Sequence, residues 1–344
     1  MALIDTPDRP GDTLGHPRDA DFPGSSTGLT GVDLYEIPDA LIPREPRLGG
    51  LCVPVPADRI AALERSGPVV LGLHPGFAHT DGFVASVMSE LRALLRLPAE
   101  HSCVLVPAPP QTLARLLAGE KWAVANDAVP LPVLEAEGPP APSDPETWTS
   151  ADLSRTSWPL HGTVLGDLDV ACFCPSWLLG VVAGCTVLTL SARAAAAARA
   201  EQDSGPFGVR ALLEPREPDG PGVSASDLMM LAHGVRSLAE AEPERLEDEV
   251  EARLDLVRTL SAGRPWLAGP PYRPGRDLAA VLPTTLAPGT VQEVSDFLES
   301  HALVYGLADP ERPGALRIGL YRTVADDDLV RLLGLLDILL GESR

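Results

Sequence analysis

The chain of 344 residues carries a net charge of −21, and 45% of its residues are hydrophobic. A chain of this length can bury a large core, which predicts one large domain with a smaller one beside it. The negative charge argues against binding to nucleic acid or to an anionic membrane surface, because both need basic patches. The sequence shows neither an apolar run of about 18 residues, as a membrane span requires, nor a signal peptide, so we expect a cytoplasmic protein with no membrane partner.

Residues 1–30 are rich in Pro, Asp, Gly and Ser without a helical or strand period, which predicts a disordered arm. Apolar residues in 83–95 recur at the spacing of an amphipathic helix, and the apolar run near 101–106 predicts a buried strand. Ser191 and Thr323 stand where N-caps of later helices are expected. We expect those later helices over 191–202, 224–240, 244–261, 290–301 and 323–340, and strands over 278–284, 303–305 and 315–321.

The stretch Asp169–Leu190 reads DVACFCPSWLLGVVAGCTVLTL and is apolar on both sides of Pro175. It predicts a short strand, a turn at Pro175 and a second strand from Gly184 to Leu190, both buried in a covered sheet. Its three cysteines, Cys172, Cys174 and Cys185, are expected to be buried, reduced thiols.

This stretch resembles the cofactor-lysine segment of the phosphoserine aminotransferases, fold-type-I enzymes that use pyridoxal phosphate (PLP). In that family the turn reads roughly Phe-x-Pro-Gln-Lys-x-Phe, and a Gly-containing apolar strand and a helix opening Ser-Pro-Ala-Ala follow. Phe173, Pro175, Gly184 and Ser191–Ala192 hold the matching places here. Ser176 and Trp177 stand where the Gln and the Schiff-base lysine belong, and a Trp cannot form an imine.

The resemblance extends to both ends of the chain, where Ile37–Pro38, Pro43–Arg44 and Gly49–Gly50 match the family's opening. It implies an α/β fold, with a large aminotransferase-like domain that holds a mainly parallel or mixed sheet between helices, plus a smaller α+β C-terminal domain. The expected bounds are an arm over 1–30, a segment over 31–57 that joins the small domain, a large domain over 58–241 that is shortened around 120–150, and a small domain over 242–344.

PLP chemistry needs an imine-forming lysine, an acid at the pyridine nitrogen and donors for the phosphate. Ser154 falls in the place of the family's acid, with Asp152 two residues away. The family's Gly-Gly-Ala-Thr phosphate turn corresponds to 108–112, where prolines remove N–H donors and only Thr112 remains to contact an anion. The single lysine, Lys121, follows a helix at the end that points away from the cofactor in the family, so we expect no cofactor.

The remaining candidates suit another ligand. Arg317 matches the family arginine that pairs with the substrate's α-carboxylate, and we expect it to face a wet cleft, with a solvent-facing strand arginine as the alternative. His74 matches the histidine of a family loop that reaches toward the neighbouring subunit, and His161 is a further acid–base candidate. The candidate set is His74 and His161 as catalytic groups, and Arg317, Trp177, Thr112 and Ser176 as substrate-binding groups, with no metal site.

Two functions remain open. The first is a PLP-independent protein that binds or converts a carboxylate-bearing small molecule in biosynthesis. The second is a non-catalytic subunit that pairs with an active aminotransferase-like chain. The resemblance implies a homodimer in the first case and a heterodimer in the second.

Overall fold

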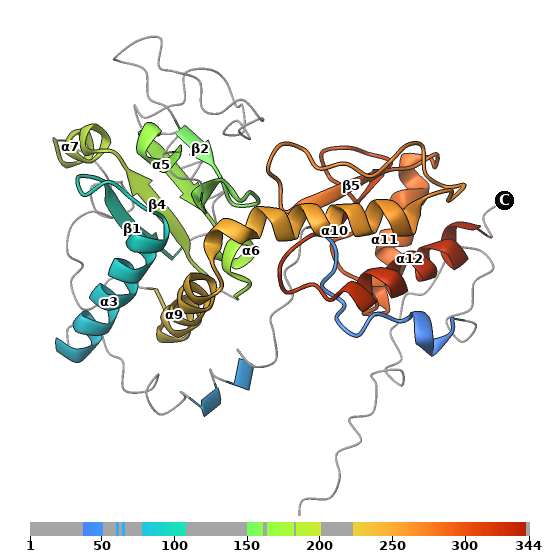
Figure 1. Cartoon of the computed structure of the whole chain (residues 1–344), viewed down its shortest axis with the longest axis horizontal. Coiled ribbons are helices and arrows are strands. Elements are labelled where there is room, and N and C mark those ends of the chain that lie inside the picture. Colours follow the sequence, from blue (N-terminus) through green and yellow to red (C-terminus); the bar gives the residue numbers. More distant parts are fainter. Residues whose placement is uncertain are drawn as a thin grey trace, which may run out of the picture.

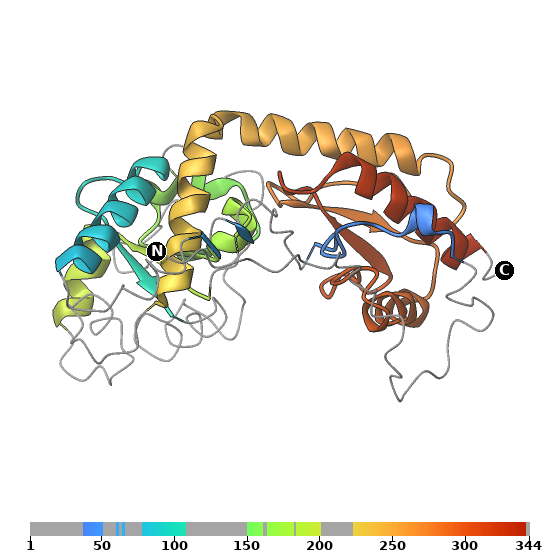
Figure 2. The same cartoon turned by 90° about the horizontal axis from the view of Figure 1, so that it is seen from below.

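The computed structural model describes residues 37–50, 60–61, 64–65, 78–107, 150–160, 164–181, 184–200 and 223–341. They form two halves that lie side by side (Figure 1). The large half is built around a four-stranded sheet and the small half around a two-stranded one. Helices α9 (Ala225–Glu240) and α10 (Leu246–Ser261) meet at an elbow, and α10 extends from the large half along the small half (Figure 2).

The sheet of the large half is mixed. β4 runs antiparallel to both of its neighbours, β1 and β3, whereas β2 runs parallel to β3. Helices accompany this sheet, so the predicted α/β class with a mixed sheet is confirmed. The strands in sheet order are β1 (Ser102–Val106), β4 (Thr186–Leu190), β3 (Val170–Phe173) and β2 (Ser150–Asp152).

The stretch 169–190 forms two neighbouring strands of this sheet, as its apolar pattern predicts. Every residue of β3 and β4 is buried, and Phe173 lies opposite Val187 in the register. The connection is more than a turn, because α6 (Pro175–Leu179) follows β3 directly, with Pro175 at its start. Proline suits a first helical turn, where its missing N–H would have no partner.

The helices of the large half follow the expected patterns. Val87 and Leu91 of α3 are fully buried, and α3 packs against α9. The Ser191 hydroxyl accepts a hydrogen bond from the Ala194 N–H at 3.1 Å, so its predicted role at the start of α7 is confirmed. The elements are α3 (Ala78–Leu94), η4 (Trp158–Leu160), α5 (Val164–Asp167) and α7 (Ala192–Ala200).

Two predictions for the small half are wrong. Residues 303–305 form no strand, because only Tyr305 makes backbone hydrogen bonds to the segment 46–49. Thr323 caps no helix, since α12 begins three residues later and the Thr323 hydroxyl has no hydrogen-bond partner within the protein. The elements are η5 (Pro243–Arg245), β5 (Ala279–Pro283), α11 (Pro288–Ser300), β6 (Ala315–Gly319) and α12 (Asp326–Gly341).

The segment 46–50 pairs with the small half. The Gly50 N–H donates to the Arg317 carbonyl at 2.9 Å, and the Gly319 N–H donates to the Leu48 carbonyl at 2.8 Å. Upstream, η3 (Asp39–Leu41) lies against α12. The domain bounds expected from the sequence remain a prediction. Among the described helices, none combines the length and apolar character needed to cross a membrane.

Candidate functional site

Ser176 and Trp177 lie in the first turn of α6, a helix of five residues. Gly180 ends this helix in the left-handed conformation, with φ of 57°, which glycine adopts without steric cost. The helix packs against α9. The segment of this chain that resembles the family's cofactor-lysine turn is therefore a short, packed helix.

Trp177 lies where α6 meets the segment that leads from β6 into α12. Its indole Nε1 is buried and has no hydrogen-bond partner among the residues that the structure describes. Trp177 lines a cavity of about 20 Å³ together with Ser237 of α9 and residues 321–323 of the small half. This volume suits one water molecule and excludes a cofactor or substrate.

The residues that the structure describes do not supply the groups that PLP chemistry needs. The described part of the chain contains no lysine that could form the imine. Asp152, the acid nearest to the expected position, accepts hydrogen bonds at its Oδ1 from the Ser154 N–H at 2.9 Å and from the Ser154 hydroxyl at 2.5 Å. Ser154 in turn accepts from the Cys174 N–H at 3.0 Å, so both side chains brace the end of β3.

Arg317 lies on β6 with its side chain 0% exposed. It pairs directly with Asp277, and its Nη1 lies 3.7 Å from Oδ2 of Asp309, which is also fully buried. Gly50 packs directly against the Arg317 side chain, because a Cβ at Gly50 would lie 2.2 Å from the Arg317 Cγ. The expectation that Arg317 faces a wet cleft is therefore wrong, as is the alternative of a solvent-facing strand arginine.

Arg317 offers no accessible positive charge to a further anion, because its side chain is enclosed beside Asp277 and Asp309. Asp309 also accepts a hydrogen bond from Arg312 at 3.2 Å. Burial raises the pKa of Asp277, and Arg317 and Arg155 oppose that rise. Asp277 and Asp309 are not among the site residues predicted from the sequence. A signal was available, because an arginine inside the otherwise apolar run 315–321 needs a charged partner when it is buried.

A second set of polar contacts joins the halves beside this cluster. The Leu278 N–H donates to the Arg155 carbonyl at 2.7 Å, and the Ser157 N–H donates to the Arg276 carbonyl at 3.0 Å. The Ser157 hydroxyl also donates to Glu247 Oε2 at 2.6 Å. The turn 153–157 of the large half is thus fixed to the small half by its backbone as well as by side chains.

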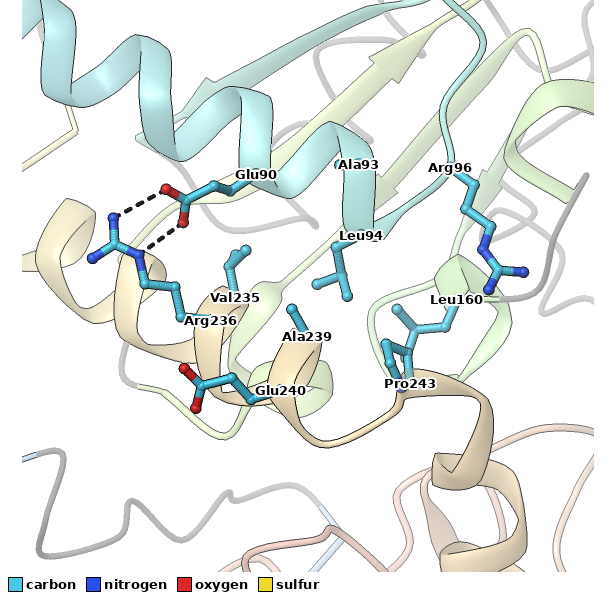
Figure 3. A pocket seen from close by; sticks show the side chains of 10 residues that line it. All are labelled: Glu90, Ala93, Leu94, Arg96, Leu160, Val235, Arg236, Ala239, Glu240 and Pro243. Carbon is cyan, nitrogen blue, oxygen red and sulfur yellow. Dashed lines mark hydrogen bonds and ion pairs between the residues drawn. The ribbon is translucent and has the colours of Figure 1, made fainter.

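A larger cavity, of about 520 Å³, opens between α3 and α9 (Figure 3). Its apolar wall is formed by Ala93, Leu94, Leu160, Val235, Ala239 and Pro243. Arg236 spans one end and meets both oxygens of Glu90, at 2.8 and 3.1 Å, while Arg96 lies at the other end (Figure 3). Of the predicted site residues that the structure describes, Arg317, Trp177 and Ser176, none lines this cavity.

Cys172 is buried and Cys174 is half-buried. Burial raises the pKa of Cys172 well above its ordinary value, and it also raises that of Cys174, where hydrogen bonds from Ser176 oppose the rise. These thiols are therefore protonated and unreactive near neutral pH. His74, His161 and Thr112 lie outside the described residues. Within those ranges, no group of three or more His, Cys, Asp or Glu side chains could hold a metal ion.

No known protein-family profile and no curated protein matches the sequence. Solved structures do. Phosphoserine aminotransferase from Cytophaga hutchinsonii is 14% identical, with a TM-score of 0.62 over 85% of this chain and 97% of that one. PLP-bound phosphoserine aminotransferase from Trichomonas vaginalis is 12% identical, with a TM-score of 0.58 over 86% of this chain and 99% of that one. Pyridoxamine-pyruvate aminotransferase from Mesorhizobium loti is 14% identical, with a TM-score of 0.59 over 88% and 94%. The predicted aminotransferase-type fold is confirmed.

Proposed function

We propose that this chain is a PLP-independent protein of the aminotransferase fold that acts as a non-catalytic subunit, paired with a second aminotransferase-like chain. The observation that carries the proposal is the burial of Arg317 between Asp277 and Asp309. A carboxylate substrate would have to displace a buried partner of Arg317, and separating a buried ion pair costs about 3–5 kcal/mol. The indole of Trp177 in the place of an amine supports the same conclusion.

The test has a cofactor arm and an assembly arm. We expect the purified protein to be colourless, and PLP followed by borohydride to leave no stoichiometric adduct. Light scattering at micromolar concentration should show a heterodimer when the protein is co-purified from its native host with a second aminotransferase-like chain. A stoichiometric PLP adduct, above all at Lys121, would refute PLP independence, and a protein that forms no complex with a second chain would refute the subunit role.

A second candidate function, the binding of a carboxylate-bearing small molecule, is favoured by the cavity between α3 and α9. Its volume of about 520 Å³ lies within the range of ligand sites, roughly 300–1,000 Å³. Arg96 lies at one end of the cavity, whereas Arg236 at the other end is paired with Glu90, and Glu240 also lines the wall.

Calorimetric titration with octanoate and 4-phenylbutyrate tests this second candidate. We expect Arg96→Gln to weaken binding, while Arg199→Gln on the exposed side of α7 leaves it unchanged. Octanol, which lacks the carboxylate, should bind more weakly than octanoate. Equal affinities of wild type and Arg96→Gln would remove the arginine from the site, and no measurable heat with either acid would remove the candidate function.

A further inference from the structure

Two residues that line the same small cavity between the halves each carry a buried polar atom with no hydrogen-bond partner among the described residues. The atoms are Nε1 of Trp177, on α6, and Oγ1 of Thr323, just before α12. The cavity beside them measures about 20 Å³ and is also lined by Leu178, Ser237 and Tyr321. The two atoms come from different halves of the molecule, 146 positions apart in the sequence.

Neither atom is satisfied by the helix next to it. The hydroxyl of Thr323 cannot cap α12, because the helix starts only at Asp326 and the intervening turn is closed by a hydrogen bond of 2.9 Å from the Val324 N–H to the Tyr321 carbonyl. The indole of Trp177 is held by the packing of α6 on α9. An unsatisfied buried polar group is costly, and native proteins satisfy nearly all of them with protein or with ordered water.

The volume and the chemistry of the cavity match one water molecule. A cavity needs roughly 10–15 Å³ of accessible volume to hold a water, and the water needs two or more polar partners. An indole N–H can only donate, whereas a threonine hydroxyl can donate and accept. A water that accepts from Trp177 and donates to Thr323 satisfies both atoms at once.

We propose that one ordered water molecule binds in this cavity, bridges Trp177 Nε1 to Thr323 Oγ1, and forms part of the contact between the large and the small half. Trp177 then acts as an anchor between the halves. This inference does not rest on the proposed subunit role, since it concerns the contact within a single chain.

The direct test uses the tryptophan indole signals of the full-length protein, labelled with ¹⁵N. Trp177→Phe assigns the Trp177 signal, which should show a cross-relaxation peak with water of the sign that a long-lived, bound water gives. Trp266 is the matched control in the same molecule, because its Nε1 donates to Asp337 Oδ1 at 2.9 Å and its residue is also buried. Its indole should show no such peak. A Trp177 signal as free of a water peak as that of Trp266 would overturn the proposal.

The energetic test is a double-mutant cycle of Trp177→Phe and Thr323→Val, read from urea unfolding. Each single change should raise the unfolded-to-folded ratio by roughly fivefold or more, and Thr323→Ser should restore most of the loss. In the double variant the two factors should not multiply, because either change alone already breaks the bridge. Factors that multiply would contradict the bridge. Should Thr323→Val fail to fold, the water peak in wild type and in Thr323→Ser still decides the question.

Discussion

Arg317 and Arg236 each hold a carboxylate, but in opposite surroundings. The side chain of Arg317 is 0% exposed and its partners Asp277 and Asp309 are 7% and 0% exposed. The side chain of Arg236 is 52% exposed and that of Glu90 is 33% exposed. Buried charges depend on their partners, whereas exposed pairs exchange with water and salt. An arginine at a position that resembles a known binding site therefore offers its charge to a ligand only if the fold leaves that charge unpaired and accessible.

The largest expected effect is the loss of the buried arginine. Arg317→Ala removes the direct partner of the buried Asp277, while Asp309 keeps its contact with Arg312. We expect the free energy of unfolding to fall by about 3–5 kcal/mol. Arg236→Ala removes only an exposed pair and should cost less than about 1 kcal/mol. Urea unfolding of the two variants measures the difference. Equal losses would show that Arg317 is not buried among charges.

A second change tests the cover over Arg317. Gly50→Ala places a Cβ 2.2 Å from the Arg317 Cγ, and overpacking of this kind typically costs about 1–3 kcal/mol. Gly289→Ala is the matched control, because no atom lies within 4 Å of a Cβ there. We expect the control to keep or slightly raise the melting temperature, while Gly50→Ala lowers it. A neutral Gly50→Ala would indicate that the segment 46–50 does not lie on Arg317.

Glu247 is partly exposed, between the extremes of the two arginine sites, and it makes the stability of the fold depend on pH. Burial raises its pKa, but hydrogen bonds from Arg273 and Ser157 outweigh that effect and lower the pKa from 4.5 to about 2. The stability that this group contributes is therefore fully present above pH 4.5 and is lost as the pH falls toward 2.

The measurement is the urea midpoint at neutral pH and at several values below the ordinary pKa of Glu247. Glu247→Gln should lower the midpoint at neutral pH and flatten the acid slope. Glu251→Gln, which removes a more exposed partner of the same Arg273, should keep the slope of wild type. An unchanged slope in Glu247→Gln would place the acid sensitivity elsewhere.

The smallest expected effect is the response of the surface pair to salt. Between about 0.01 M and 1 M salt the Debye length falls from about 30 Å to about 3 Å. The small stability difference between wild type and Arg236→Ala should shrink over this range, whereas the difference for Arg317→Ala should persist. Parallel salt series of urea unfolding measure both. A salt-sensitive Arg317 would contradict its burial.

Much of the fold could be predicted from the sequence because its signals are local. The apolar run 169–190 gives β3 and β4, and the stripe of α10 at Leu246, Val250, Leu254 and Val257 is buried as its period indicates. Gly263, with φ of 77°, follows the end of α10 in the left-handed conformation that is common just after a helix. That Trp177 stands in the place of a cofactor lysine remains an interpretation of the sequence.

The tertiary structure alone decided the partners of the candidate residues. Arg317 meets Asp277, 40 positions away, and Trp177 shares a cavity with Thr323, which the sequence assigns to a helix cap. Periodicity and capping patterns report only on neighbours within a few turns of the chain, whereas these contacts depend on how the two halves pack. Local patterns in the sequence therefore predict most of the elements, whereas the packing of the halves encloses Arg317 and brings Trp177 to their contact.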